Sequence, residues 1–200
     1  MSFYSKAKFL LAGLIRKLWR IKVVGKENEV ENKPYLICSN HMSMLDPVVI
    51  GAAIKHNPKY MAKAEVMRVP VLKSLLKALG AFSVDRGGSD VAAIKKTINL
   101  LKDGDAVVMF PQGTRHKGVD PRTTSVKFGC SMIAQRAEVG VLPIFIKVKD
   151  HRVRIFRKTV IIIGKEITFD ELNAISKGGE DHKSAAEYIF SKITELEDTV

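Results

Sequence analysis

The sequence predicts a single α/β domain in which helices flank a largely parallel, mixed β-sheet, with a basic amphipathic helix at the N-terminus. Two hundred residues are enough for one domain with one sizeable core. Short apolar runs alternate with segments of helical periodicity, which is the pattern of parallel strands joined by helices. An apolar content of 46% and a charged content of 27% are ordinary for a globular protein and argue against disorder.

The expected elements follow in chain order. Apolar runs predict six strands, at residues 35–38, 60–62, 82–84, 106–110, 142–148 and 160–163. Apolar residues at mostly helical spacing predict four helices, at residues 71–79, 91–101, 125–139 and 184–197. The second of these helices has the best defined ends, because Ser89 can cap its N-terminus and Gly104 can terminate it.

A histidine and an aspartate, His41 and Asp46, closely follow the first apolar run. An imidazole titrates near neutral pH, and a carboxylate beside it can fix its tautomer and stabilise the imidazolium, so the pair suits proton removal from a hydroxyl group. Five residues leave the two side chains out of phase on a helix. The chain must therefore turn between them, with a helix beginning near Pro47. The alternative for Asp46 is a purely structural role as a helix N-cap.

A second candidate segment follows the apolar run 106–110 and ends in Arg115, after a loop that contains Gly113. A guanidinium can grip a phosphate bidentately, and a glycine lets backbone N–H groups approach it. Ligands of open parallel sheets bind at the carboxyl ends of the strands. His41 and Arg115 are therefore expected on the same rim of the sheet.

These segments resemble sequence blocks of the glycerolipid acyltransferases, most closely the bacterial 1-acylglycerol-3-phosphate (lysophosphatidic acid) acyltransferases. Four blocks occur in the family's order: His41 to Asp46, Gly80 to Arg86, Phe110 to Arg115 and Val141 to Ile146. The third block departs from the family at Gln112, where the family usually carries glutamate. Glutamine keeps the size and one carbonyl acceptor but loses the charge.

The resemblance implies transfer of a fatty acyl group from an acyl thioester to the free hydroxyl of lysophosphatidic acid, giving phosphatidic acid. The acyl donor would be acyl-carrier protein or acyl-coenzyme A, both acidic and suited to a basic surface. His41 would be the general base and Asp46 its orienting partner. The other implied site residues are the phosphate-binding cations Arg115, Arg86 and Lys63, and the acceptor loop Gln112, Gly113 and Thr114.

The cysteines favour direct transfer without a covalent acyl-enzyme. Cys38 and Cys130 are expected to be buried small hydrophobic residues, and no serine lies in a nucleophile-elbow pattern. The spacing of cysteine and histidine predicts no metal site, and no cofactor is expected.

The charge predicts a polyanionic partner. The net charge is +12 and the isoelectric point about 9.7. Residues 1–26 contain seven lysines and arginines and no acidic residue. A shared helical face contains Phe3, Leu10, Leu14, Leu18 and Ile21. We expect residues 1–26 to lie in the interface of an anionic membrane and residues 27–200 to form the catalytic domain. The alternative is a helix packed on the domain with a solvated basic face.

The resulting expectation is a peripheral enzyme at the cytoplasmic face of the cell membrane. Within the same class, the alternative is an acyltransferase for another lysophospholipid or lipid acceptor. A membrane-bound scaffold without activity, marked by Gln112, is a further alternative. A basic nucleic-acid-binding protein is disfavoured, and no nucleic acid is expected as a partner, because aromatic residues make up only 7% of the chain and no known nucleic-acid motif is present.

Overall fold

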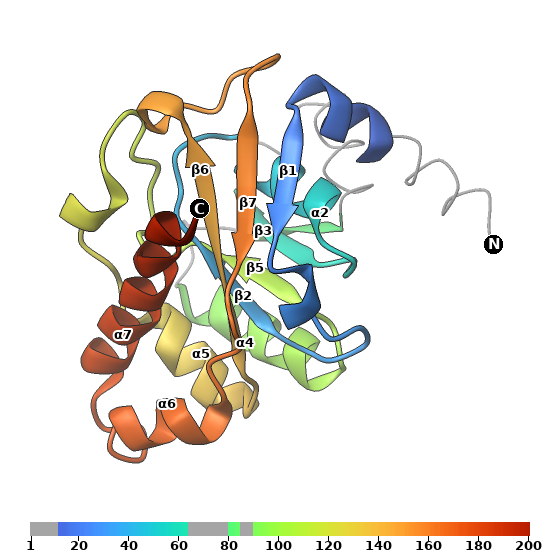
Figure 1. The fold of residues 1–200 in the computed structure, drawn as a ribbon. Coiled ribbons are helices and arrows are strands. Elements are labelled where there is room, and N and C mark those ends of the chain that lie inside the picture. The colour runs from blue at the N-terminus through green and yellow to red at the C-terminus, as the bar shows by residue number, and fades with distance from the viewer. Residues whose placement is uncertain (1–11, 64–79, 85–89) are drawn as a thin grey trace.

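The computed structural model describes residues 12–63, 80–84 and 90–200, which form a mixed sheet between two helical layers (Figure 1). Within these residues the strand order is β1-β7-β6-β2-β5-β3-β4. Neighbouring strands pair in parallel except β6 and β7, which are antiparallel, so the predicted fold class is confirmed. The strands are β1 (Ile21–Val24), β2 (Leu36–Ser39), β3 (Lys59–Lys63), β4 (Ala81–Val84), β5 (Val107–Met109), β6 (Val141–Val148) and β7 (Thr159–Ile163).

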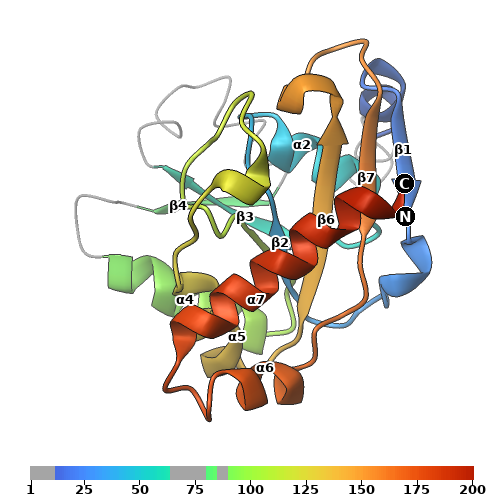
Figure 2. The same ribbon diagram turned by 60° about the vertical axis from the view of Figure 1, so that its left-hand side comes forward.

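Helices cover both faces of the sheet (Figure 2). The helices are residues 12–18, α2 (Asp46–Ala53), α4 (Asp90–Lys102), α5 (Gly129–Ala137), α6 (Phe169–Ile175) and α7 (His182–Glu195). Short 3-10 turns are η1 (Lys26–Asn28), η3 (Pro121–Thr123), η4 (Lys149–His151) and η5 (Leu196–Thr199). None of the helices in the described part of the chain is both long and apolar enough to cross a membrane.

Alternation along the central strand β2 divides the core into two clusters. Leu36 and Cys38 belong to the cluster that α4, α5, α6 and α7 cover. Ile37 belongs to the other cluster, with α2 and residues 12–18. Successive side chains of a strand point to opposite faces, so a strand buried on both sides reads as one continuous apolar run. This is why the sequence identified the central strands.

Several predicted boundaries differ from the observed ones. The predicted helix 91–101 is confirmed as α4, but its predicted cap Ser89 and the predicted helix 71–79 lie outside the described residues. The helix expected at 125–139 is shorter, because the chain makes η3 and a loop before α5. The helix expected at 184–197 begins earlier, at His182, where the Asp181 carboxylate caps the Ser184 N–H at 2.9 Å. Helix α6 was not predicted.

The N-terminal segment differs most from the expectation. The helix ends at residue 18, and the chain continues as β1, which pairs in parallel with β7 from Ile21 to Val24. The expectation of a helical face reaching Ile21 is therefore wrong, and the sheet includes residues that were assigned to the membrane segment. Ile15 and Trp19 are buried, whereas Leu14 is exposed. Residues 12–19 thus match the alternative of a packed helix with exposed basic side chains. Residues 1–11, with Phe3 and Leu10, lie outside the described residues, so their membrane role stays a prediction.

Candidate active site

The predicted pair of His41 and Asp46 is in direct contact. Strand β2 ends at Ser39 and α2 begins at Asp46, so the intervening turn folds the two side chains together. His41 Nδ1 and Asp46 Oδ2 are 2.7 Å apart. The Asp46 side chain is fully buried, and the His41 side chain is 16% exposed. A buried carboxylate on Nδ1 keeps the proton on that nitrogen and leaves Nε2 free to accept one.

Asp46 also holds the turn in shape. Its Oδ2 accepts hydrogen bonds from the backbone N–H groups of Met42 at 2.6 Å and Ser43 at 2.7 Å. Asp46 is the first residue of α2, where the helix dipole favours a negative charge. The N-cap position belongs to Leu45, and no side chain caps it, so the alternative of an N-cap role alone for Asp46 is wrong.

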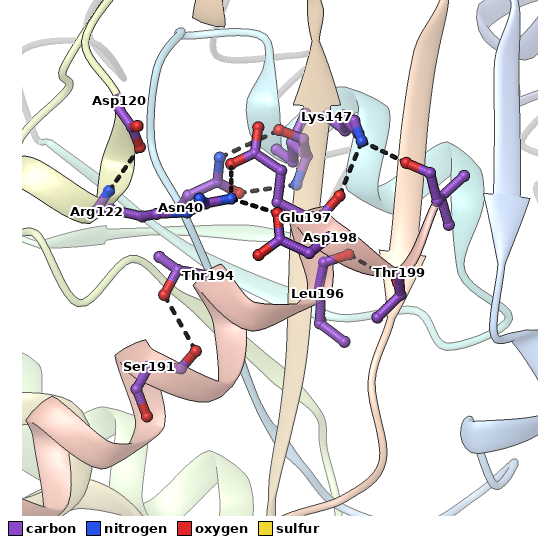
Figure 3. Close-up of polar contacts among 12 residues, drawn as sticks. Asn40, Asp120, Arg122, Lys147, Ser191, Thr194, Leu196, Glu197, Asp198 and Thr199 are labelled. Carbon is purple, nitrogen blue, oxygen red and sulfur yellow. Dashed lines mark hydrogen bonds and ion pairs between the residues drawn. The ribbon is translucent and has the colours of Figure 1, made fainter.

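Asn40 fixes the end of β2, a role that the sequence did not suggest. Its Oδ1 accepts from the Ile146 N–H at 2.8 Å, and its Nδ2 donates to the Ile146 carbonyl at 3.2 Å. The side-chain amide thereby continues the β2–β6 pairing for one residue past Ser39, directly before His41 (Figure 3). Asn40 is fully buried, so this pairing holds the backbone of the dyad in one place.

The loop after β5 supplies the other side of the site. The Phe110 ring stacks on the His41 imidazole, with centroids 3.9 Å apart and planes inclined by 15°. The His116 N–H donates to the His41 carbonyl at 2.9 Å. The dyad is therefore held by β2, α2 and the β5 loop together, as the parallel strand order predicts.

Gln112 is a structural bridge rather than a surface residue. Its Oε1 accepts from the His41 N–H at 2.7 Å, and its Nε2 donates to Thr124 Oγ1 at 2.7 Å. The Thr124 hydroxyl in turn donates to the Pro121 carbonyl at 2.6 Å. Gln112 is buried, and each of its bonds uses the correct donor and acceptor. The Gln112 amide N–H therefore suits the Thr124 oxygen, which accepts a hydrogen bond because the hydroxyl hydrogen is already donated to the Pro121 carbonyl.

Three of the other predicted site residues, Gly113, Thr114 and Arg115, follow β5, and a fourth, Lys63, ends β3. Gly113 has a φ of 69°, and Thr114 and Arg115 after it are exposed. Arg115 directly precedes His116, whose N–H donates to the His41 carbonyl, so the backbone of Arg115 lies next to the dyad. Lys63 is the last residue of β3, which pairs with β5 at its start. Arg86 lies outside the described residues.

The loop between β5 and α5 is tied to the C-terminal segment (Figure 3). The Arg122 guanidinium contacts Glu197 at 2.9 Å and Asp198 at 2.8 Å. Lys147 Nζ donates to the Glu197 carbonyl at 2.8 Å and also contacts the Val200 carbonyl. Arg122 lies two residues before Thr124, the partner of Gln112. These ion pairs therefore hold the same loop that contacts the His41 backbone through Gln112.

The cysteines are buried free thiols, as predicted. Burial, with Cys130 beside it, raises the pKa of the Cys38 thiol well above its usual range. A neutral buried thiol is a poor nucleophile. Within the described residues, histidine, cysteine and acidic side chains form no group of three that could hold a metal ion.

A hollow of about 410 Å³ lies away from the dyad. Its lining includes Glu31, Lys55 and Asp105, which precede the first residues of β2, β3 and β5. Because these strands are parallel, the hollow opens at the rim opposite His41. The hollow is therefore not part of the candidate site around His41.

Comparison with known proteins agrees with this geometry. Residues 20–147 match the acyltransferase family. A 1-acyl-sn-glycerol-3-phosphate acyltransferase of Bacillus subtilis is 35% identical over 124 residues, which cover 62% of this chain and 60% of the relative. An enzyme of the same name from Streptococcus pneumoniae is 36% identical over 121 residues, which cover 58% of this chain and 42% of the relative.

The fold is also similar to that of a solved relative. The crystal structure of the 1-acyl-sn-glycerophosphate (LPA) acyltransferase PlsC from Thermotoga maritima matches 98% of this chain and 83% of its own, with a TM-score of 0.70 and 25% identity. The chain spans about half the length of the curated relatives it matches. The family match covers well over half of the chain, from β1 to β6, and contains the dyad and the Gln112 loop. The chain therefore belongs to the acyltransferase family.

Proposed function

We propose that this protein transfers a fatty acyl group from an acyl thioester to the free hydroxyl of lysophosphatidic acid and so forms phosphatidic acid. The observation that carries the proposal is the contact of 2.7 Å between His41 Nδ1 and the buried Asp46 carboxylate, at the strand end next to the Arg115 loop. The names of the similar bacterial proteins support this choice of acceptor.

In the proposed reaction, Nε2 of neutral His41 removes the proton of the acceptor hydroxyl as its oxygen attacks the thioester carbonyl. The C–S bond then breaks, and the imidazolium returns the proton to the leaving thiolate. Asp46 stabilises the imidazolium while it exists and prevents the ring from turning. Phe110, stacked on the same ring, further limits its rotation. The buried state of both cysteines supports attack without an acyl-enzyme.

We assign the acceptor phosphate to the cations predicted from the sequence, with Arg115 as the first choice and Lys63 and Arg86 as further candidates. Gln112, Gly113 and Thr114 form the proposed acceptor loop. The donor, acyl-carrier protein or acyl-coenzyme A, is acidic in either case and suits the net charge of +12. We place the protein peripherally at the cytoplasmic face of the membrane, with residues 1–11 as a candidate contact.

An acyl-transfer assay with labelled donor tests the proposal directly. The full-length protein is given lysophosphatidic acid, other lysophospholipids and a lysolipid without phosphate, each with both donors. We expect product with lysophosphatidic acid and much less with the acceptor that lacks phosphate. Preference for another lysophospholipid would favour the alternative acceptor, and no transfer to any acceptor would favour the inactive scaffold.

Arg115→Ala tests the phosphate assignment within that assay. A bidentate, charge-assisted contact contributes roughly 1.5–3 kcal/mol, so its loss should raise the Michaelis constant for lysophosphatidic acid by about 10- to 100-fold. The Michaelis constant for the donor should change little. Lys117→Ala, a neighbouring exposed cation of the same loop, serves as the matched control.

A further inference from the structure

The connection between β6 and β7, residues 149–158, carries two large apolar residues on an exposed turn. The Arg157 N–H donates to the Arg154 carbonyl at 3.3 Å, which closes a four-residue turn with Ile155 and Phe156 at its centre. Ile155 is 50% exposed and Phe156 is 71% exposed. Phe156 has a φ of 63°, a region that turns usually fill with glycine or asparagine. Neither core packing nor backbone preference therefore accounts for an aromatic residue at this position.

Positive charge surrounds this turn. Five of the ten residues from 149 to 158 are lysine or arginine, and one is acidic. All five basic residues are exposed: Lys149, Arg152, Arg154, Arg157 and Lys158. An apolar tip within a ring of cations is the composition of a segment that binds an anionic lipid surface.

The β6–β7 hairpin, residues 149–158, leaves the sheet at the rim where His41 and Asp46 lie. Strand β6 is parallel to β2, so its last residue, Val148, lies toward the same rim as His41. The Gly118 N–H donates to the His151 carbonyl at 3.0 Å and joins the hairpin to the loop that contains Gln112 and Arg115. A membrane in contact with the hairpin would therefore lie beside the mouth of the active site.

The same turn also contacts the end of the N-terminal helix. The Phe156 N–H donates to the Leu18 carbonyl at 2.8 Å. Leu14, about one turn earlier on this helix, is 53% exposed. Figures 1 and 2 both show the connection extending beyond the sheet next to residues 12–18. The apolar residues of the hairpin and the helix thus face solvent in one region of the molecule.

We propose that residues 149–158 form a membrane-docking hairpin for an anionic phospholipid bilayer. Ile155 and Phe156 enter the headgroup region, and the basic side chains contact lipid phosphates. The docked hairpin holds the His41 rim against the surface that contains the acceptor. An acidic carrier protein accounts for the cations but not for the two exposed apolar residues. The link to the acceptor rests on the proposed function, whereas docking itself is measured without turnover.

Vesicle binding by the full-length protein tests the proposal. Vesicles of phosphatidylcholine with about one third phosphatidylglycerol provide the anionic surface. Ile155→Ser with Phe156→Ser should weaken binding about tenfold at both low and high salt, because apolar insertion is not screened. Arg154→Gln with Arg157→Gln should weaken binding at least tenfold at low salt and little at high salt.

Matched controls come from the opposite rim. Val30 is a 55% exposed apolar residue in the loop before β2. Lys102, the last residue of α4, and Lys177, which follows α6, are exposed cations. Val30→Ser and the pair Lys102→Gln with Lys177→Gln should leave vesicle binding within about twofold of the parent. Equal losses in these controls would mean that binding depends on overall charge or folding, and would overturn the proposal.

Insertion can also be observed directly with Phe156→Trp. The chain has one tryptophan, the buried Trp19, so the second emission reports on the turn. We expect a blue shift on addition of anionic vesicles, and none for Val30→Trp. Normal vesicle binding by the Ile155 and Phe156 double variant, together with a raised Michaelis constant for acyl-carrier protein, would assign the hairpin to the donor and overturn membrane docking.

Failure of the proposed function gives a different result. If the parent protein transfers no acyl group to any acceptor, including a short-chain soluble one, the acyltransferase assignment fails, while the vesicle measurements still decide the role of the hairpin. If the hairpin variants bind vesicles weakly but keep parental turnover on the soluble acceptor, both proposals hold.

Discussion

At the scale of single residues, the contacts of Asp46 allow the proposed chemistry of the dyad to be tested apart from its contribution to stability. In His41→Ala, Asp46 Oδ2 keeps its two backbone N–H donors, so the turn before α2 should persist. Loss of a general base typically lowers the rate by about 10²- to 10⁴-fold. We expect a fall in kcat of this size with a thermal midpoint close to that of the parent. Near-parental kcat in this variant would show that His41 is not the base.

Asp46→Asn tests whether the two side chains act as a unit. The amide oxygen can still accept hydrogen bonds, but a neutral group no longer stabilises the imidazolium. We expect a severe loss of kcat in the single variant and no further loss when His41→Ala is already present, because groups that act together are not additive. Independent, multiplying effects of the two substitutions would contradict the dyad.

We expect Gln112 to support the backbone of His41, with its amide N–H donating to the Thr124 hydroxyl. In Gln112→Glu the carboxylate can still accept from the His41 N–H. Its second oxygen, however, faces a hydroxyl that already donates to the Pro121 carbonyl. Re-forming these bonds should cost about 1 kcal/mol of stability, with a modest change in rate. Thr124→Val removes the hydroxyl and should make Gln112→Glu clearly more damaging, measurable as coupling in a double-mutant cycle. A large gain of activity in Gln112→Glu would instead indicate a protein adapted to another acceptor.

The contact that the sequence predicted joins two residues that are close together in the chain. His41 and Asp46 are five residues apart, and Pro47 indicated where the helix begins, so their contact could be inferred. Asn40, Phe110 and Thr124 were missed because their partners are distant: Asn40 pairs with Ile146, 106 residues along the chain. Asn40 and Phe110 give only the signal of a polar or aromatic residue directly after a buried strand, and Thr124, which follows η3, does not give that signal.

At the scale of elements, the contact between the β5–α5 loop and the C-terminal segment should affect activity more than stability. Arg122→Ala removes both ion pairs with Glu197 and Asp198. Ion pairs of an exposed side chain contribute little to stability, so the thermal midpoint should barely change. We expect a several-fold lower kcat and faster backbone hydrogen exchange in residues 111–127, the loop that supports His41.

The control for this prediction breaks another exposed ion pair, away from the loop. Lys183→Ala removes the contact with Glu187 on α7 and leaves the loop untouched. Its kcat and exchange should match those of the parent. If Arg122→Ala behaves in the same way, the C-terminal contact does not position the site.

Strand β1 predicts where the chain can be shortened. A protein that begins at Lys26 lacks β1, which pairs with β7 in the sheet. It also lacks the buried side chains of Ile15 and Trp19, which pack in the core. Removal of a buried tryptophan alone costs about 3–5 kcal/mol, a large part of the 5–15 kcal/mol that stabilises a typical domain. We expect this protein to be largely unfolded by circular dichroism, whereas one that begins at residue 12 should keep a cooperative transition. A cooperative transition in the shorter protein would show that β1 is dispensable.

The strands in the middle of the sheet were predictable because both of their faces are buried. Strand β1 was not, because it is an edge strand with an exposed lysine among its apolar residues, and the basic sequence before it suggested a continuing helix. Helix α5 begins later than expected because the chain before it forms η3 and a loop in which Thr124 contacts Gln112. Tertiary contacts of the site thus override the local helical period.

At the scale of the whole molecule, composition predicted the amount of positive charge but not its location. Residues 1–26 and 149–158 together carry most of the net charge of +12. The fold brings the described parts of these segments together through the contact of Phe156 with Leu18. The polarity of the parallel strands places this region on the same rim as the dyad. A charge that seemed to belong to an N-terminal helix is therefore shared by two distant segments.

This arrangement predicts that salt should lower turnover of an acceptor embedded in a membrane more than turnover of a soluble acceptor. At an ionic strength of about 0.15 M exposed charges interact over only about 8 Å, and at 1 M over about 3 Å, so binding to an anionic membrane weakens as salt is added. The contact between His41 and the buried Asp46 is only slightly screened. We therefore expect added salt to lower turnover of lysophosphatidic acid embedded in anionic vesicles about tenfold or more. Turnover of a short-chain acceptor free in solution should change far less, since only its phosphate contact with Arg115 is screened. The ratio of the two rates, measured with one donor across a salt series, gives the contribution of membrane binding to turnover. A ratio that stays constant with salt would mean that the basic rim serves the acceptor phosphate or the donor alone.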